Sequence, residues 1–348
     1  MRPRNRGDAV ASPLMRALRI VGGTLLGLAI AIVSAWCVLA IWRAPVGSPR
    51  VCEELAALFG LIALATLVGL FTRWRRRALS AFAVALVAFT LGWSLIRPSN
   101  DRSWRAEESV LPYADIEGNR VRIHNIRNFQ YRTETDFTPA WYDKTFDLNE
   151  LDSVDLIAFY WMGPDIAHTL LSFGFAGRDY LAISIEARKE QGEGYSALDG
   201  FFRHFELYYV VADERDVIGV RAIYREDPPE DVYLYAVNGS RESAQRVFLD
   251  YLREINALRD RPEFYNTLTT NCTTNIWMHA RMNPNHVPFS WKILVSGHLP
   301  AYLYEQGRLD TRVPFEMLRQ RARVNERARE AGAGAPDFSQ RIRGDRAR

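Results

Sequence analysis

One cysteine, Cys272, lies in a sequence context that favours nucleophilic chemistry. It is preceded by Thr270 and Asn271 and followed by two further threonines. Thr and Asn cap helices, so this pattern predicts that Cys272 occupies the first turn of a helix. There, free N–H groups and the positive end of the helix dipole stabilise a thiolate. The same N–H groups could hold an oxyanion during acyl transfer. The alternative is a small, buried and unreactive side chain.

A nucleophilic thiol needs an imidazole within hydrogen-bond reach and a third group that orients the ring. His168 is the strongest candidate among the six histidines, because it begins a predicted strand that follows a Trp-Met-Gly-Pro turn. The next predicted strand alternates, so that Glu186 and Arg188 share one face. A hairpin loop with an odd number of residues would bring His168 level with Glu186 or Arg188, and an even number would oppose it to Ala187. Glu186 is the candidate for orienting the histidine.

The other histidines are weaker candidates. His279 follows Cys272 by seven residues, which places it on the same helix face but two turns away. The remaining four lack an obvious polar setting and are expected to be structural or surface groups: His124, His204, His286 and His298. The chain has no HExxH and no paired CxxC motif, so neither a metal site nor a cofactor is expected.

Substrate binding is less clearly encoded. Arg188 could bind an anionic group of a substrate, and Ser172 and Asn271 are further weak candidates for substrate contacts. The net charge of +3 is close to neutral for 348 residues, and no basic face with interleaved aromatic residues stands out. Nucleic acid is therefore not an expected partner.

Three apolar runs near the N-terminus predict a membrane anchor over residues 17–97. The runs cover about 17–42, 55–72 and 78–96, and each is long enough to cross a hydrocarbon core of roughly 30 Å. A cleaved signal peptide would explain only the first run. Trp36, Trp42, Trp74 and Trp93 lie near the ends of the runs, as is typical of membrane interfaces.

Arginines in the short flanking segments predict the orientation. The N-terminal segment 1–16 is Arg-rich, and the second loop contains arginines at 73 and 75–77. Because basic short loops stay in the cytoplasm, both should be cytoplasmic, and everything after Ile96 should lie outside. We therefore expect a multi-pass protein of the bacterial inner membrane with a periplasmic domain. That domain contains one cysteine, so it can form no internal disulfide.

Beyond the anchor, the pattern predicts a linker over 98–118, an α+β domain over 119–317, and a basic, solvated tail over 318–348. Asn and Gly precede an apolar stripe of 3.6-residue period, which predicts a helix from Ser240 to Leu258. Shorter helices are predicted over 196–205, 213–224 and from 272 to before 284. Period-two and turn signals predict strands over 121–129, 137–148, 154–161, 167–175, 180–188, 206–212 and 231–237.

Three ordered motifs resemble a known family. They are His168-Thr-Leu-Leu-Ser-Phe-Gly-Phe175, Leu181-Ala-Ile-Ser-Ile-Glu-Ala-Arg188 and Asn271-Cys-Thr-Thr-Asn-Ile-Trp277. Together they resemble the bacterial family that shares the N-terminal periplasmic domain of the Lnb lipoprotein N-acyltransferase, over about 121–309. The resemblance implies a Cys–His acyl-transfer site, with Cys272 as nucleophile and His168 as base. The order His, acidic residue, Cys is also similar to circularly permuted papain-like enzymes of the NlpC and lecithin–retinol acyltransferase type. That similarity implies an antiparallel sheet and Glu186 as the orienting group.

The expected function is a membrane-anchored thiol acyltransferase or acyl hydrolase that works through a thioester. Membrane lipids, and lipoproteins or other acylated envelope substrates, are the expected partners. One alternative is a cysteine amidase or peptidase that acts on cell-wall peptides. The other is a binding module of an envelope complex with no catalytic activity. The residues specify neither the acyl donor and acceptor nor the oligomeric state.

Overall fold

The computed structural model describes residues 13–45 and 47–344, and the chain divides into two compact units between Arg97 and Pro98. This boundary agrees with the predicted end of the membrane anchor. Most of the segment expected to be cytoplasmic, 1–16, lies outside the described residues.

The first unit consists of three helices that are long and apolar enough to cross a membrane. They are α1 (Pro13–Trp42), α2 (Pro49–Gly69) and α3 (Arg75–Leu95). α2 begins six residues before the predicted apolar run because Ser48 caps it and its first turns contain charged residues. α3 likewise includes Arg75–Arg77, which composition had assigned to a loop. A charge at the end of a span interrupts the apolar run without ending the helix.

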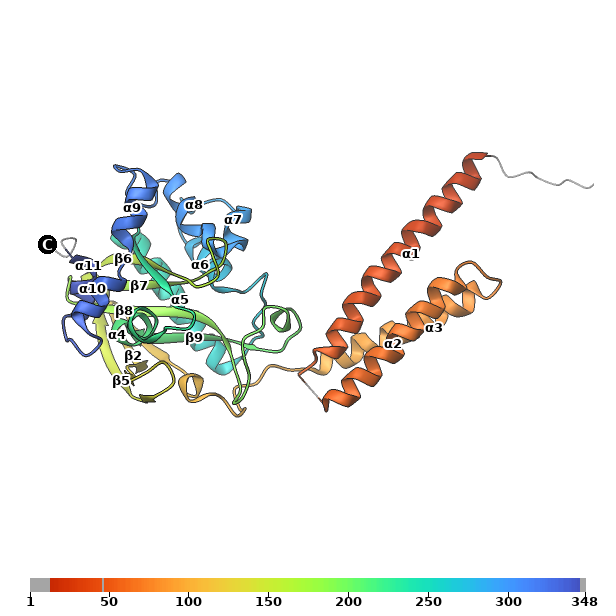
Figure 1. Ribbon diagram of the computed structural model, residues 1–348, viewed down its shortest axis with the longest axis horizontal. Helices are drawn as coiled ribbons and strands as arrows, with labels where there is room; N and C mark the ends of the chain where they lie inside the picture. The colour runs from red at the N-terminus through yellow and green to blue at the C-terminus, as the bar shows by residue number, and fades with distance from the viewer. Residues whose placement is uncertain (1–12, 46, 345–348) are drawn as a thin grey trace, which may run out of the picture. The chain divides into compact units, whose positions relative to one another are not determined.

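The second unit, from Pro98 onward, is built on an eight-stranded sheet that is antiparallel except for one contact between β2 and β9. β5 (Trp141–Asp147) pairs with β2, and β3 (Gln130–Tyr131) pairs with β4 (Phe137–Thr138) in a separate small sheet. The main strand order is β1 (Tyr113–Glu117), β2 (Arg120–Arg127), β9 (Glu206–Asp213), β8 (Asp179–Arg188), β7 (Ala167–Phe175), β6 (Leu151–Tyr160) and β10 (Asp231–Ala236). The predicted α+β fold with an antiparallel sheet is confirmed (Figure 1).

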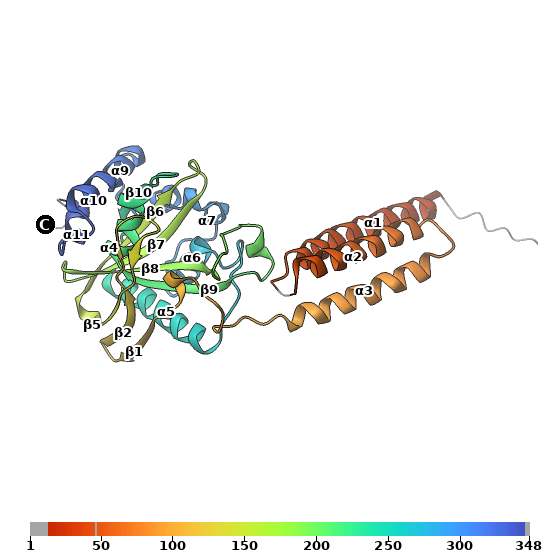
Figure 2. The ribbon, with the colours of Figure 1, turned by 60° about the horizontal axis from the view of Figure 1, so that its bottom comes forward.

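Helices cover both faces of the sheet (Figure 2). The larger core cluster packs strands against α5 (Arg241–Asp260) and α6 (Cys272–Ala280), together with α7 (Trp291–Leu294), α8 (Leu299–Glu305) and α9 (Phe315–Ala322). The smaller cluster lies on the opposite face, against α4 (Glu214–Gly219), the π-helix Val220–Tyr224, α10 (Asn325–Ala331) and α11 (Phe338–Arg343). Short 3-10 turns occur at Ala106–Glu108, Leu148–Glu150, Asp199–Phe201 and Ser296–His298.

The helix predicted after Ser240 matches α5 closely. Ser240 accepts a hydrogen bond from the backbone N–H of Ser243, which caps the helix. Its apolar stripe is buried against the sheet, with Phe248 and Tyr251 fully covered. The amphipathic period and the cap agree, so sequence alone locates this element.

The C-terminal segment differs from the solvated tail that its composition predicts. Residues 315–343 form α9, α10 and α11, and Phe338 and Ile342 are buried. Arg343 is itself buried, and its guanidinium is paired with Asp155 at 2.7 Å and with Glu214 at 2.7 Å. A buried cation with two buried carboxylate partners ties this segment to the sheet, and arginine content alone does not reveal such pairing.

The predicted linker is also shorter in the structure. β1 lies inside 98–118 and pairs with β2, while Trp104 is buried. The backbone N–H of Ser99 donates to Glu206 at 3.1 Å, and the Asn100 amide donates to the carbonyl of Leu258 at 3.0 Å. The chain therefore joins the folded domain almost immediately after the third span.

Candidate active site

Two neighbouring strands separate where the candidate residues lie. Pairing between β7 and β8 ends at Leu170 and Ser184, although β7 stays paired with β6 to Ala167 and β8 stays paired with β9 to Arg188. The hairpin turn contains three residues, 176–178, between the paired residues Phe175 and Asp179. The odd loop length fixes the register that the sequence left open, and continuing it places His168 level with Glu186.

The gap between the strands lets side chains from both faces of the sheet meet. His168 shares the face of Leu170, which packs in the cluster with α4. α6 lies on the other face, where Ile276 joins the larger core. The Cys272 thiol nevertheless lies close enough to the His168 imidazole and to Thr169 for both residues to lower its pKa. The strand separation thus brings the thiol to the ring.

The start of α6 is built as the sequence predicts. The Asn271 carboxamide oxygen accepts from the backbone N–H of Thr274 at 2.8 Å and so caps the helix. The Asn271 amide group donates to the carbonyl of Thr267 at 2.7 Å. A cap of this kind is typically worth about 1 kcal/mol and fixes the first turn. Cys272 is the first residue of α6 and is partly buried.

His168 is held from its other side by a hydroxyl and a carboxylate. Its Nε2 lies 2.7 Å from the Ser184 Oγ and 3.0 Å from the Glu186 Oε1. The Ser184 hydroxyl in turn donates to the Glu186 Oε1 at 2.7 Å. With Nε2 on the carboxylate side, Nδ1 is the ring nitrogen that remains for the thiol of Cys272. The three side chains therefore fix the tautomer and the ring plane.

The electrostatics favour a charged pair. Burial works to lower the pKa of His168, but the charge of Glu186 and hydrogen bonds to Cys272 and Glu186 outweigh it and raise the pKa to about 9. Burial works to raise the pKa of the Cys272 thiol, but the hydrogen bond and charge of His168 outweigh it and lower the pKa below its ordinary value. These shifts favour thiolate and imidazolium together near neutral pH.

Glu186 stays ionised in this setting. Burial works to raise its pKa, but the charge and hydrogen bond of His168, followed by the charges of Arg221 and Lys189, lower the pKa far below the usual carboxyl range. The guanidinium of Arg221 lies 4.0 Å from the Glu186 Oε1. The carboxylate is thus available to stabilise an imidazolium throughout the neutral range.

The weaker substrate-binding candidates are occupied by structural contacts. Arg188 is 2% exposed, stacks on the Trp104 ring at 4.1 Å, and donates to the carbonyls of Glu108 and Ser109. Ser172 is fully buried and donates to Glu214, in the cluster that holds Arg343. Asn271 adjoins the thiol, but its side chain is used in the helix cap. Neither Arg188 nor Ser172 is brought to the thiol.

His279 forms a separate buried cluster. Its Nδ1 lies 2.8 Å from Asp250 and its Nε2 lies 2.7 Å from the Tyr209 hydroxyl. Burial lowers its pKa, which favours the neutral ring. These contacts give His279 a structural role in the core.

Sequence reasoning missed two contributors to the site. Ser184 lies on the same strand face as Glu186, so the period-two pattern carried a signal for it. Arg221 had no signal, because it reaches the site from the π-helix that follows α4. A π-helix after a short α-helix places side chains off the 3.6-residue period.

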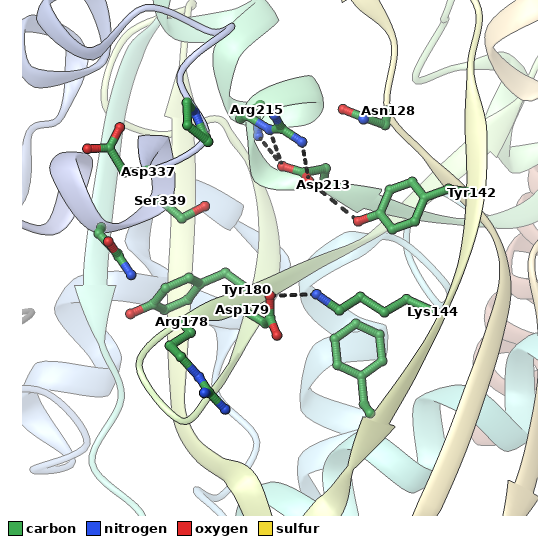
Figure 3. Close-up of a pocket in the computed structure, with 13 residues that line it drawn as sticks. Asn128, Tyr142, Lys144, Arg178, Asp179, Tyr180, Asp213, Arg215, Asp337 and Ser339 are labelled. Carbon is green, nitrogen blue, oxygen red and sulfur yellow. Dashed lines mark hydrogen bonds and ion pairs between the residues drawn. The ribbon is translucent and has the colours of Figure 1, made fainter.

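Two cavities open in the second unit. One of about 260 Å³ lies beside the site, with Ser184 and Glu186 in its wall and Leu170 in its lining. The larger, of about 350 Å³, lies at the opposite end of the β7–β8 hairpin, around Asp179 and Tyr180. In Figure 3 two charged pairs line it, with Lys144 toward Asp179 and Arg215 toward Asp213. No cluster of three or more His, Cys, Asp or Glu side chains suited to a metal ion is found in residues 13–45 and 47–344.

One family model matches the soluble domain. Residues 137–297 match the family model described as the Lnb N-terminal periplasmic domain, which confirms the resemblance noted in the sequence motifs. The matched segment includes His168, Glu186 and Cys272. Neither a curated protein nor a solved structure matches the chain.

Proposed function

Because the chain carries an Lnb N-terminal periplasmic domain behind three apolar helices, we propose that it is a membrane-anchored cysteine acyltransferase or acyl hydrolase acting on envelope lipids or lipoproteins. The observation that carries this proposal is the proximity of the Cys272 thiol to the His168 imidazole, whose ring is paired with Glu186 at 3.0 Å. A thiol, an imidazole and an orienting carboxylate are the parts that covalent acyl transfer requires.

In the first half-reaction, the Cys272 thiolate attacks the carbonyl carbon of an ester or amide. A C–S bond forms, and the carbonyl electron pair moves to oxygen, where the first N–H groups of α6 stabilise it. The tetrahedral species collapses with cleavage of the C–O or C–N bond. The His168 imidazolium gives its proton to the leaving alcohol or amine. Glu186 stabilises the imidazolium before this transfer.

In the second half-reaction, the neutral His168 accepts a proton from an amine or from water as that group attacks the thioester. The C–S bond breaks, the acyl group leaves on the acceptor, and the thiolate returns beside an imidazolium. An amine acceptor makes the protein a transferase, and water makes it a hydrolase. Both outcomes use the same three side chains.

The location of the domain follows from the same reasoning. The Arg-rich loop between α2 and α3 and the family of the soluble domain support an inner-membrane protein with a cytoplasmic N-terminus and a periplasmic domain. A thiol enzyme tethered there meets lipid esters and lipoproteins in two dimensions, which raises the effective concentration of its substrate.

A cysteine peptidase of cell-wall peptides is the second candidate. The order of His168, Glu186 and Cys272, with the cysteine at the start of a helix packed on an antiparallel sheet, supports a permuted papain-like arrangement. Enzymes of that arrangement include peptidases as well as acyltransferases. The two candidates differ in the substrate, not in the attacking group.

Probes with thiol-reactive acyl groups test these proposals. The full chain in lipid nanodiscs is treated with probes of equal reactivity that have either a lipid tail or a peptide tail. We expect the lipid-tailed probe to label wild type faster and Cys272→Ser to lose labelling. Faster labelling by the peptide-tailed probe would favour the peptidase. Equal labelling of wild type and Cys272→Ser would reject the catalytic proposal.

A further inference from the structure

Exposed apolar side chains lie on chain segments that are hydrogen-bonded to residues next to the Cys–His pair. They come from four segments: the β6–β7 loop, the β8–β9 connection, the residues before α6, and the start of α7. The following side chains, which we call the apolar ring, are between 40% and 63% exposed: Met162, Ile166, Leu198, Phe201, Leu268 and Trp291.

Hydrogen bonds hold these segments against the site. The backbone N–H of Thr267, in the loop before Cys272, donates to the carbonyl of Gly200 at 3.2 Å, beside Phe201. The backbone N–H of Ala167, next to His168, donates to the Ser296 hydroxyl at 3.0 Å. The Thr273 hydroxyl donates to the carbonyl of Ile293 in α7 at 2.6 Å. The ring is therefore fixed by the same backbone that fixes the catalytic residues.

The chain enters the soluble domain at this same end of the sheet. Ser99 is bound to Glu206, and Glu206 pairs with Arg188, two residues beyond Glu186 on β8. Two residues of strand correspond to about 7 Å. Only residues 96–98 separate Ser99 from Leu95, the last residue of α3. The covalent path from the third span to Ser99 is at most about 14 Å long.

We propose that the apolar ring inserts into the surface of the bilayer that α1–α3 cross, so that the Cys272 thiol meets the ester carbonyls of lipids without extracting them. This inference rests on the proposed function. Leaving several large apolar side chains exposed to water around one site is unfavourable in free energy, whereas a lipid surface buries them. Surface-bound proteins bury such faces about 5–10 Å into the headgroup and acyl boundary, which is where lipid ester carbonyls lie. The short link between α3 and Ser99 favours the bilayer, and not a second protein, as the partner that covers the apolar ring.

Fluorescence quenching tests the contact directly. The full chain, with its three cysteines replaced by alanine, receives one new cysteine by Trp291→Cys or, as control, by Arg178→Cys in the turn at the far end of the β7–β8 hairpin. Each is labelled with an environment-sensitive fluorophore and placed in nanodiscs that contain doxyl-labelled phospholipid. We expect at least about twofold quenching at position 291 and little at 178. Equal, weak quenching at both positions would overturn the proposal.

Kinetics separate this inference from the proposed function. In the native-cysteine chain, Trp291→Ser and Leu198→Ser should each slow acylation by a phospholipid ester in the nanodisc by about tenfold or more. Their alkylation by water-soluble iodoacetamide should be unchanged. Met317→Ser, which removes an exposed apolar side chain outside the ring, should change neither rate. If wild type is not acylated, the proposed function is rejected. If both ring variants are acylated at the wild-type rate, only the insertion of the apolar ring into the bilayer is rejected.

Discussion

The pH dependence of Cys272 alkylation gives the sharpest test of the charged pair. We consider replacing His168 with alanine in a chain whose other cysteines, Cys37 and Cys52, are already alanine. In wild type the raised pKa of His168, about 9, keeps most of the rings protonated at pH 7. That charge and its hydrogen bond lower the thiol pKa. Without the ring, burial remains and raises the thiol pKa.

The expected ratio of the alkylation rates of wild type and His168→Ala follows from two opposing effects. Below both pKa values, each unit by which the thiol pKa falls gives about ten times more thiolate, while the intrinsic reactivity of that thiolate falls about threefold. In that range, wild type should therefore react about threefold faster for every unit that separates its thiol pKa from that of His168→Ala. At a pH above both pKa values, the more basic thiolate of the variant should react faster. The two profiles should cross.

Stopped-flow alkylation with iodoacetamide between pH 5 and 10.5 measures both profiles. His124→Gln is the matched control, because this ring also binds a carboxylate, Asp143 at 2.6 Å, but lies on β2. Its profile should coincide with wild type. A His168→Ala profile with the same midpoint as wild type, lowered equally at every pH, would refute the charged pair. It would mean that the substitution changed access to the thiol and not its ionisation.

Four further predictions follow from the same contacts. Glu186→Gln removes the charge that raises the His168 pKa. In a pH–rate profile, the alkaline midpoint of acyl transfer should therefore fall from about 9 toward roughly 6.5. Ser184→Ala should lower kcat/KM about tenfold or more by freeing the ring, and Ser184→Thr should restore part of it. Arg343→Leu removes the guanidinium that neutralises two buried carboxylates and should lower the free energy of unfolding by roughly 3–5 kcal/mol in a denaturant titration. Phe248→Ala, at a fully buried position of α5, should cost a similar 3–5 kcal/mol while leaving Cys272 alkylation intact.

Local sequence patterns predicted most of the helices and strands. The strand from Ala167 to Phe175 and the helix after Ser240 were predicted nearly to the residue, because period, cap and turn signals agree there. The three apolar spans were equally clear from composition. The helix at Cys272 was located by its two candidate capping residues, Thr270 and Asn271, of which Asn271 is the cap. These are features in which neighbours in sequence determine the structure.

Contacts between residues far apart in the sequence were harder to predict. The Arg-rich segment after 318 reads as a tail, since nothing local reveals that Arg343 is neutralised by Asp155 and Glu214 from distant elements. The helix expected over 196–205 is reduced to the 3-10 turn Asp199–Phe201. Within 98–118, β1 was missed because five residues give too short a pattern to distinguish a strand from a linker.

The candidate site depends on geometry that no local pattern encodes. Pairing between β7 and β8 stops at the Leu170–Ser184 pair, and this separation lets a thiol from one face of the sheet meet an imidazole from the other. Sequence supplied the residue types and three possible positions opposite His168, namely Glu186, Ala187 and Arg188, and the hairpin length of three residues selects Glu186. Arg221 lay outside any predicted motif because a π-helix positions it.

Mass spectrometry of an acyl intermediate tests the central claim most directly. The full chain in nanodiscs of defined phospholipid is quenched in acid, which preserves a thioester, and digested. The account predicts a fatty-acyl mass on the peptide that contains Cys272, lost on treatment with hydroxylamine and absent in Cys272→Ala. Acyl transfer that continues at the wild-type rate in Cys272→Ala, with no adduct on the wild-type peptide, would contradict it.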